Sequence, residues 1–334
     1  MKRTQILHES EKFSRVLEVK LKGKSFSTPT YFPAISSYGI KFSLWDSIYF
    51  LTFHKFPRVL VSAYDLHNSN ERKRLLTLLK KHAKKGFLYL DSGIYESSWK
   101  ADPTWDIGSY KTLLSQVTFD LYSSFDIIPT GRSYEEFRKE TFHNVLDSCV
   151  FMNNNIFIPI IHGSSPEELI GVLRDIIAEH SQLVGNIGIP ERDCGKSVSE
   201  RATTIIEARR ILNEVDDKII LHILGCGNPL SMLLYSYCGA DIFDSLDWLK
   251  YVINPKRESI EDFAYLELLN CDCKVCSDPQ FENAEYSQKT VLHNLLFYQN
   301  FVIRLQSLIR NNNIKGYLQG RARMGKILDE LDEL

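Results

Sequence analysis

The sequence lacks the features of a membrane protein, a secreted scaffold or a strongly basic binding protein. It contains no uninterrupted run of about 18 apolar residues, so we expect no membrane-spanning helix. The amino-terminal residues lead into charged sequence without an apolar segment, so we expect no secretory signal and a cytoplasmic protein. With 40 basic and 42 acidic side chains, the chain has no overall positive field, and any polyanion must be bound by a local patch.

Cysteine is too scarce for a disulfide framework, because only seven occur among 334 residues, and we expect reduced thiols. Four are scattered along the chain and are expected to be buried as small apolar side chains: Cys149, Cys194, Cys226 and Cys238. The other three are clustered near the carboxyl end, and this cluster requires a separate explanation.

Eight short runs rich in apolar and β-branched residues recur over the first 245 residues, with helical patterns between them. This alternation predicts parallel β-α units. The strands are expected near residues 30–36, 58–63, 86–91, 119–126, 156–161, 184–189, 218–224 and 240–243. Among the helical segments, residues 165–180 have apolar side chains at a 3.6-residue period, and Ser165 and Pro166 supply a helix start.

Eight such strands fit a closed (β/α)8 barrel of the TIM type or an open doubly wound sheet, and polar residues favour the barrel. Asp91, Asp126, His162 and Asp244 each lie at, or one residue past, the carboxyl end of an expected strand. Barrel enzymes build their active sites on that rim. We therefore predict an α/β fold with a catalytic barrel over residues 1–250. Residues 251–334 are expected to form a cysteine-containing segment and helices packed on the barrel, with a long helix over 284–311.

The clustered cysteines form a Cys-X-Cys-X-X-Cys run, made of Cys271, Cys273 and Cys276, and His293 follows at helical distance. Three thiolates and one imidazole make the tetrahedral ligand set that Zn²⁺ prefers in closed sites. We therefore predict a structural zinc ion, because four protein ligands leave no open position for a catalytic water. The alternative is three free thiols and a solvent-facing histidine.

Two aspartates are the candidate catalytic groups. Asp91 and Asp244 each follow an apolar strand directly and precede a turn, so their side chains can face each other across the mouth of a barrel. Two carboxylates on either side of a sugar suit glycosidic-bond chemistry, in which one attacks the anomeric carbon and the other handles the proton of the leaving group. Each aspartate could instead cap the helix that follows it.

Two further residues are candidates for binding a nucleobase. Asp126 could accept hydrogen bonds from the N–H edge of a base, or cap a helix. Tyr95 could stack on a base, or pack as an aromatic residue of the barrel rim.

These residues resemble the motifs of the tRNA-guanine transglycosylase superfamily. The Asp-Ser-Gly-Gly-Phe-Gln motif of that family is similar to residues 91–96, and its Gly-X-Asp-X-Phe-Asp segment matches residues 239–244. The residues 222–229 are similar to its Gly-X-Gly-X-Pro turn, and its zinc site is a Cys-X-Cys-X-X-Cys run followed by a His-Asn pair, as at His293 and Asn294. The matches span residues 29 to 300 and keep the order of the family.

The resemblance implies an exchange of guanine for a free 7-deazaguanine base in a nucleic acid. Asp244 would be the nucleophile that forms a covalent glycosyl-enzyme, and Asp91 would be the acid/base group. The residues implied to bind the base are Tyr95, Ser92, Asp126, His162, Gly163 and Gly188. His162-Gly163-Ser164 stands where the family has Gln-Gly-Gly, and Gly188-Ile189-Pro190 where it has a Gly-Gly pair, which leaves the incoming base open.

Other departures bear on the polymer that is modified. Residues 245–250 differ from the Pro-Thr-Arg-Asn-like segment with which bacterial tRNA enzymes bind the anticodon loop. From the 334 residues given, we expect no counterpart of the extra RNA-binding domain of archaeal enzymes. Residues 31–37, 62–65 and 91–96 look more like the DNA 7-deazaguanine transglycosylase (DpdA-like) branch, so we favour DNA over tRNA. Candidate phosphate-binding residues are Lys80, Lys81, Lys84, Arg321 and Arg323, although the lysines also suit an ordinary solvated helix face.

Two other functions stay open at this point. A non-catalytic partner subunit would keep the fold and the zinc site but would depend on another chain, whereas a glycoside hydrolase would use the same carboxylates on a small sugar. The sequence also leaves open a homodimer or a helper protein.

Overall fold

Eight parallel strands form the centre of the molecule. The computed structural model describes residues 4–40, 42–152, 155–321 and 324–333. The strands of the main sheet follow the order β8-β7-β6-β5-β4-β11-β10-β9. Their bounds are β4 Thr30–Ile35, β5 Arg58–Ser62, β6 Phe87–Asp91, β7 Leu121–Ser123, β8 Ile156–Ile158, β9 Asn186–Pro190, β10 Ile220–Leu224 and β11 Ile242–Ser245.

The two edge strands of this sheet meet and close it into a barrel. The N–H of Ile161 donates to the carbonyl of Gly188 (2.8 Å), and the N–H of Gly188 donates to the carbonyl of Pro159 (2.9 Å). β8 ends before Pro159, which has no N–H to give to a ladder, so the contact is a single bridge rather than a long pairing. The predicted α/β barrel is confirmed.

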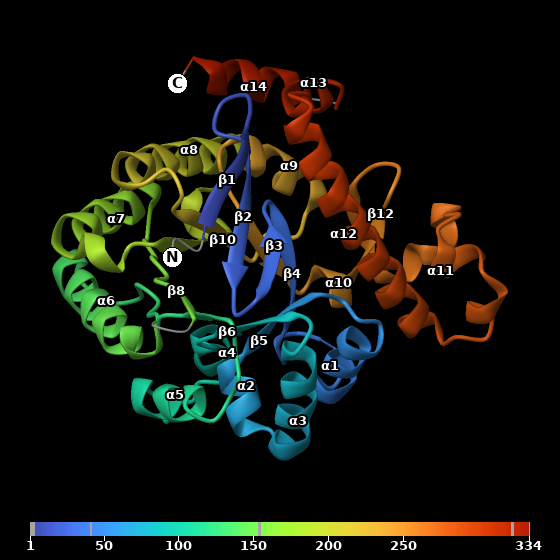
Figure 1. Cartoon of the computed structure of the whole chain (residues 1–334), viewed down its shortest axis with the longest axis horizontal. Coiled ribbons are helices and arrows are strands. Elements are labelled where there is room, and N and C mark those ends of the chain that lie inside the picture. Colours follow the sequence, from blue (N-terminus) through green and yellow to red (C-terminus); the bar gives the residue numbers. More distant parts are fainter. Residues whose placement is uncertain (1–3, 41, 153–154, 322–323, 334) are drawn as a thin grey trace.

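Helices surround the barrel (Figure 1). Ser165 accepts a hydrogen bond from the N–H of Glu168 at the start of α7, with Pro166 in the first turn, as expected. Ser197 and Glu200 form a capping box that starts α8. The bounds are α1 Leu44–Phe53, α2 Ala63–Asn68, α3 Arg72–Ala83, α4 Ile94–Trp99, α5 Ile107–Leu114, α6 Tyr134–Ser148, α7 Pro166–His180, α8 Val198–Val215 and α9 Pro229–Tyr237.

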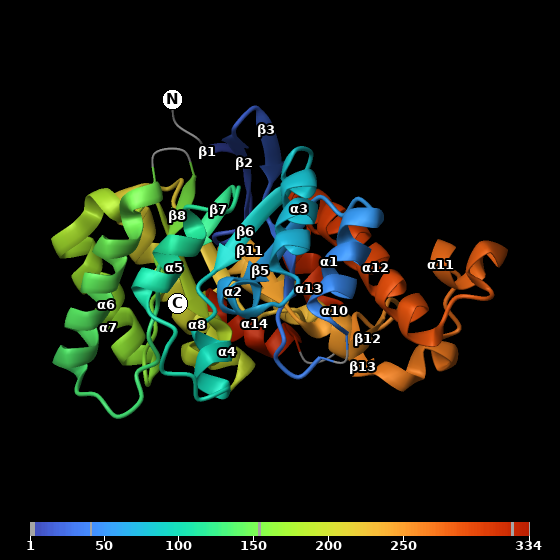
Figure 2. The ribbon, with the colours of Figure 1, turned by 90° about the horizontal axis from the view of Figure 1, so that it is seen from below.

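A small antiparallel sheet that the sequence analysis missed covers the amino end of the barrel. It consists of β1 Thr4–Glu9, β2 Arg15–Leu21 and β3 Lys24–Ser27, at one end of the barrel in Figure 2. Leu17, Val19 and Phe26 from this sheet share one apolar cluster with residues inside the barrel such as Phe32 and Tyr89. The small sheet therefore closes one end, and the opposite end stays accessible.

The carboxyl-terminal part packs beside the barrel. It contains α10 Asp247–Lys250, the hairpin β12 Tyr251–Asn254 and β13 Ser259–Asp262, α11 Lys274–Ser277, α12 Tyr286–Arg310, α13 Ile314–Gln319 and α14 Met324–Asp332. The predicted long helix over 284–311 corresponds to α12, whereas the hairpin was not predicted. Short 3₁₀ turns lie at η1 Cys149–Phe151, η2 Ser181–Leu183, η3 Glu191–Cys194, η4 Phe263–Leu269 and η5 Pro279–Phe281.

A buried ionic network ties several of these elements together. Asp241, directly before β11, accepts hydrogen bonds from Arg15 of β2 (2.8 Å) and Arg209 of α8 (2.7 Å). Arg209 also donates to the backbone carbonyls of Gly239 and Ile219. The charges are paired inside the protein, as burial requires.

Two expectations about single features can be checked here. Among the described residues, none of the helices combines the length and apolar character needed to span a bilayer. None of the seven cysteines, all of which the structure describes, forms a disulfide. Cys194, Cys226 and Cys238 are buried as expected, but Cys149 is only half-buried, at the start of a 3₁₀ turn that follows α6.

Candidate active site and metal centre

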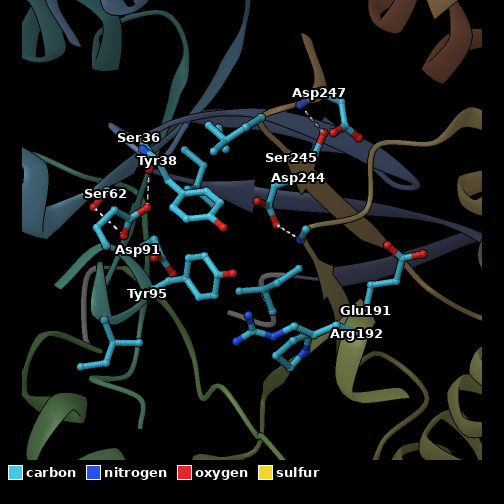
Figure 3. A pocket seen from close by; sticks show the side chains of 18 of the residues that line it. Ser36, Tyr38, Ser62, Asp91, Tyr95, Glu191, Arg192, Asp244, Ser245 and Asp247 are labelled. Carbon is cyan, nitrogen blue, oxygen red and sulfur yellow. Dashed lines mark hydrogen bonds between the residues drawn. The ribbon is translucent and has the colours of Figure 1, made fainter. Parts of the chain in front are cut away.

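A cavity of about 350 Å³ lies at the carboxyl ends of the barrel strands. Its size and position are those of an active site in this class of fold. It brings together five residues that the sequence analysis singled out, from the ends of β6, β7, β8 and β11 and from α4: Asp91, Asp126, His162, Asp244 and Tyr95. Figure 3 shows several of the side chains that line it.

Asp244, within β11, is held by two hydrogen bonds at its Oδ1. The N–H of Gly225 donates to it (3.2 Å), and Nε2 of His222 lies 2.9 Å away. With Nε2 donating, Nδ1 of His222 accepts the hydroxyl proton of Tyr89 at 3.2 Å, so both ring nitrogens are satisfied. Among the residues that the structure describes, these bonds fall on Oδ1, which leaves Oδ2 to face the cavity (Figure 3).

Asp91 ends β6 and has different surroundings. The N–H of Gly93 donates to its Oδ2 (3.1 Å), and the hydroxyl of Ser123 lies 3.4 Å from its Oδ1. Burial, followed by the charges of Asp126 and Glu96, raises the pKa of the Asp91 carboxyl well above its usual value. Asp91 is therefore suited to carry a proton at neutral pH.

Gly93 allows the turn that follows Asp91. Its φ is +76°, and a Cβ there would lie 2.5 Å from the Cβ of Tyr64. Only glycine fits both the left-handed backbone and this close approach. The turn places the N–H of Gly93 against Asp91 and starts α4, which carries Tyr95 into the cavity wall.

Asp126 and His162 form part of a buried polar chain. One oxygen of Asp126 accepts the hydroxyl of Ser92, and the other lies 2.8 Å from Nε2 of His162. Nδ1 of His162 lies 2.7 Å from Asp193 of η3. Burial opposes the charged form of the ring, but the two carboxylates raise the pKa of His162 to about 9.

Aromatic and cationic side chains meet at the cavity mouth. The rings of Tyr38 and Tyr95 contact edge to face, with centroids 4.9 Å apart. The guanidinium of Arg192 lies 4.5 Å from the centroid of Tyr95, and Nζ of Lys250 lies 4.5 Å from that of Tyr38. Figure 3 shows both tyrosine rings projecting toward the space in front of Asp244. These four side chains offer stacking faces and positive charge beside the carboxylates.

Three residues implied to bind the base do not line the cavity. Ser92 is buried behind it and supports Asp126 through its hydroxyl. A Cβ on Gly163 would lie 2.4 Å from the N of Leu169, and one on Gly188 would lie 2.6 Å from the side chain of Ile160. Gly163 therefore allows close packing against the start of α7, and Gly188 allows it between the barrel strands. Neither glycine is among the residues that line the cavity.

The candidate phosphate-binding residues lie away from the cavity. Lys80, Lys81 and Lys84 are exposed near the end of α3, where the chain enters β6, on the side of the small amino-terminal sheet. Arg321 pairs with the buried carboxylate of Glu258 (2.8 Å), so its charge is used within the fold. Arg323 lies outside the described residues.

Sequence reasoning missed several residues that line the cavity or brace it. Glu96 accepts hydrogen bonds from Ser36 and Ser62, and burial raises its pKa. Burial also raises the pKa of Asp247 to about 6. The run Glu191-Arg192-Asp193 follows β9 directly, so the rule that found Asp91 and Asp244 could have found it. His222 is the one polar residue of an otherwise apolar strand, which was also a usable signal.

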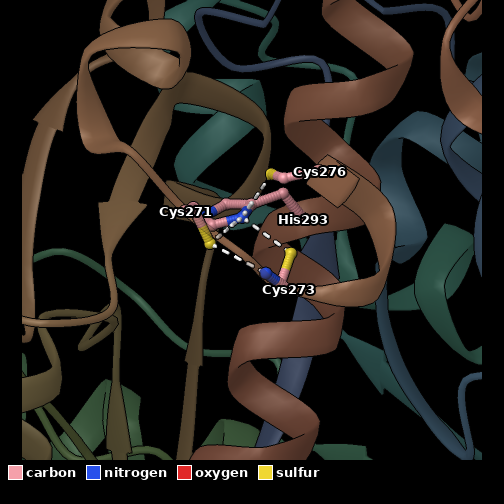
Figure 4. A group of neighbouring side chains, drawn as sticks. All are labelled: Cys271, Cys273, Cys276 and His293. Carbon is pink, nitrogen blue, oxygen red and sulfur yellow. Dashed lines mark hydrogen bonds between the residues drawn. The ribbon is translucent and has the colours of Figure 1, made fainter. Parts of the chain in front are cut away.

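The predicted metal ligands lie together beside α12 (Figure 4). Nδ1 of His293 lies 3.7, 3.4 and 3.5 Å from the sulfurs of Cys271, Cys273 and Cys276. A tetrahedral zinc ion with Zn–S of about 2.3 Å and Zn–N of about 2.0–2.1 Å gives an S···N distance of roughly 3.6 Å. Nε2 of His293 donates to the carbonyl of Ile253 (2.8 Å), which leaves the lone pair of Nδ1 facing the sulfurs. The four residues therefore fit a zinc ion.

No model of a known protein family matches this chain, but several curated proteins named tRNA-guanine(15) transglycosylase are similar to it. The tRNA-guanine(15) transglycosylase of Nanoarchaeum equitans is 25% identical over 91% of this chain and 74% of that protein. The enzymes of the same name from Methanococcus aeolicus and Methanococcus vannielii are 22% and 23% identical, over 92% and 91% of this chain. The chain spans 50% of the length of each of these two Methanococcus proteins.

Proposed function

We propose that this chain, which belongs to the tRNA-guanine transglycosylase superfamily, is a guanine transglycosylase that exchanges guanine in a nucleic acid for a free 7-deazaguanine. One observation carries the proposal: Asp91 and Asp244 line the same cavity, with opposite surroundings. Pairs of carboxyl groups whose environments separate their protonation states commonly act as acid and nucleophile.

The first half of the reaction breaks the bond between guanine and the sugar. The free oxygen of Asp244 attacks C1′, the C1′–N9 bond breaks, and its electron pair goes to the base. Asp91, in its protonated form, gives its proton to the leaving guanine. The product is a covalent ester between Asp244 and C1′, which splits one difficult displacement into two easier ones.

The second half reverses these steps with a different base. A 7-deazaguanine occupies the place of guanine, Asp91 takes the proton from the nitrogen that attacks, and the new C1′–N bond displaces Asp244. Two inversions at C1′ leave the configuration of the sugar unchanged. The hydrogen bonds from Gly225 and His222 support this cycle, because they hold Asp244 in one orientation throughout.

The base would be bound by Asp126 and Tyr95. The carboxylate oxygens of Asp126 are hydrogen-bond acceptors, which suits the N–H groups on one edge of guanine and of 7-deazaguanine. Tyr95 would stack on the extruded base, and the extrusion itself is required because a stacked base cannot reach a buried nucleophile. Zinc held by the three cysteines and His293 would stabilise the segment beside α12 and would take no part in the exchange.

DNA is the polymer that we propose, because residues 245–250 differ from the segment with which bacterial tRNA enzymes of the superfamily bind the anticodon loop. tRNA is the second candidate, because the relatives above are named for tRNA. The two candidates share the chemistry at Asp244 and differ only in the polymer that carries the sugar.

Base exchange can be measured directly with labelled guanine. The zinc-loaded protein is incubated with labelled guanine and either DNA or unmodified tRNA, and label in the acid-precipitable polymer is counted. We expect incorporation into DNA, and unlabelled 7-cyano-7-deazaguanine should compete with it. Incorporation into tRNA alone would reassign the polymer. If neither polymer takes up label, and 7-deazaguanine is not incorporated by mass spectrometry, the proposed activity is wrong.

A further inference from the structure

His162 occupies a site between two carboxylates, one on each side of its ring. Nε2 lies 2.8 Å from Asp126 and Nδ1 lies 2.7 Å from Asp193, and all three side chains are largely buried. A neutral imidazole has one N–H and one lone pair, so it can satisfy only one of two carboxylates. Two ionised carboxylates at these distances both receive a hydrogen bond only from the doubly protonated, positively charged ring.

The groups around this ring favour its positive charge. Asp126 is also bound by Ser92, and Arg192 approaches the other oxygen of Asp193 at 3.4 Å. Asp91, on the neighbouring strand, is close enough for its pKa to be raised by the charge of Asp126. Burial and the charge of Arg192 disfavour the protonated ring. Asp126, Asp193 and any ionised fraction of Asp91 favour it. The direct contacts with Asp126 and Asp193 outweigh the effect of burial, so the pKa of His162 is raised.

We infer that His162 is a positioning residue of the base subsite, which holds the carboxylate of Asp126 in one orientation and has no N–H left to offer to the base. The role of Asp126 in this inference rests on the proposed function. Asp193 lies in η3 and binds the other side of the His162 ring, but it does not line the cavity itself. Recognition of a base by this chain then depends on Asp126 as an acceptor, with His162 and Asp193 fixing the orientation of its carboxylate.

A histidine titration by NMR tests the charge on the ring without any substrate. The protein has nine histidines, and the signal of His162 is assigned by its loss in H162Q. We expect one imidazole that stays protonated to about pH 9 in the wild type. In D193N its midpoint should fall by about one unit or more, because one of the two carboxylates is neutralised. D329N is the control: it changes the net charge of the protein by the same amount as D193N, but at α14, away from the cavity. It should leave the midpoint of His162 unchanged.

The pH dependence of base binding tests the link to Asp126. Above the midpoint of His162 the neutral ring keeps a single N–H and can no longer donate to both Asp126 and Asp193, so Asp126 loses its fixed orientation. In the wild type the KM for the free base should therefore rise above this midpoint, by up to about tenfold per pH unit. In D193N this rise should begin at lower pH, by the same interval as the NMR midpoint moves, and the change in pH dependence should appear in KM rather than in kcat. Comparing the two proteins at each pH cancels the titration of the base itself.

The outcomes separate the inference from the proposed function. A His162 midpoint near 6.5, or one that D193N does not move, overturns the inference even if base exchange proceeds. A KM profile that fails to follow the midpoint in D193N also overturns it. If no polymer exchanges its base, the proposed function fails, but the NMR titration still decides whether His162 is the charged link between the two aspartates. D193N serves where H162Q does not fold.

Discussion

Asp91 and Asp244 are chemically identical side chains that the fold places in opposite surroundings. Asp244 receives hydrogen bonds from Gly225 and His222, whereas Asp91 lies beside two other carboxyl groups, Asp126 and Glu96. The first arrangement suits an anion that attacks, and the second suits a carboxyl group that keeps its proton. The sequence predicted both residues from their places at strand ends, but not this difference. Gly225 and His222, which bind Asp244, and Asp126, which lies beside Asp91, come from other segments of the chain.

Replacing Asp91 by asparagine tests its role in proton transfer. D91N keeps the shape of the side chain and the bond from Gly93 but removes the proton that the leaving base needs. We expect kcat to fall by about 10²–10⁴-fold. The activity of the wild type should fall with rising pH as Asp91 loses its proton, at a pH above the usual range of an aspartate. The residual activity of D91N should lack this fall. Steady-state exchange rates from pH 5 to 10 measure both effects. D147N, at the surface ion pair with Lys111, is the matched control, and a D91N rate equal to that of the control contradicts the assignment.

The charge on His162 also predicts how stability depends on pH. The pKa of His162 is raised in the folded protein to about 9 from an ordinary value of 6.5. Its contribution is therefore complete below pH 6.5 and is lost as the pH rises through 9, with an upper value of about 3 kcal/mol. The free energy of unfolding of the wild type should exceed that of H162Q most at low pH, and the difference should shrink between pH 6.5 and 9. A difference that is constant with pH would show a neutral ring.

At the scale of elements, the sequence predicted the barrel strands well and the additions to the barrel poorly. Apolar runs marked all eight strands within a few residues, because strands buried on both faces are continuously apolar. β7 and β8 are shorter than predicted, since Pro159 interrupts the second. The sheet β1–β3 and the hairpin β12–β13 were missed, although Leu17, Val19 and Leu21 alternate as a half-buried strand requires.

The segment around α11 depends on its metal ligands more than on its packing. Its apolar cluster is small, with Val252, Leu266 and Leu269 at its centre. Asn294 of α12 binds the backbone of Trp248, Tyr251 and Ile253, so α12 itself is anchored independently. Loss of zinc should therefore unfold the cysteine segment before the barrel.

C273S tests this dependence. We expect the variant to lose bound zinc, measured by emission spectroscopy, and to melt at a temperature lower by about 5–15 °C. C149S removes a thiol outside the cluster and should keep both the metal and the melting temperature. Full zinc content in C273S would contradict the predicted ligand set.

The whole molecule is held by contacts between distant parts of the chain that sequence periodicity cannot reveal. The small amino-terminal sheet fills one end of the barrel with Phe26, whose ring lies 4.8 Å from that of Phe87. Asp241 joins β2 and α8 to the start of β11, the strand that carries Asp244. The barrel rule could predict that strand-end residues converge on one rim, and four of them do line one cavity. It could not predict which end would be closed or what braces each side chain.

Asp241→Asn tests the buried network as a determinant of stability rather than of chemistry. The change leaves Arg15 and Arg209 without their shared anion, and we expect a loss of about 3–5 kcal/mol in the free energy of unfolding by urea. Asp217→Asn, at an exposed pair with Lys218, should cost less than about 1 kcal/mol. Activity per folded molecule should be retained in both variants. A loss for D241N as small as that of D217N would contradict this view of the network.

The covalent intermediate tests the central claim, that Asp244 attacks the sugar of a nucleic acid, most directly. The protein is mixed with a DNA or tRNA substrate, denatured rapidly and digested, and the peptides are searched by mass spectrometry for an attached nucleotide without its base. We predict this adduct on the peptide that contains Asp244, in the wild type and not in D244N. An adduct on another residue, or exchange of labelled base by D244N at the wild-type rate, would contradict the account.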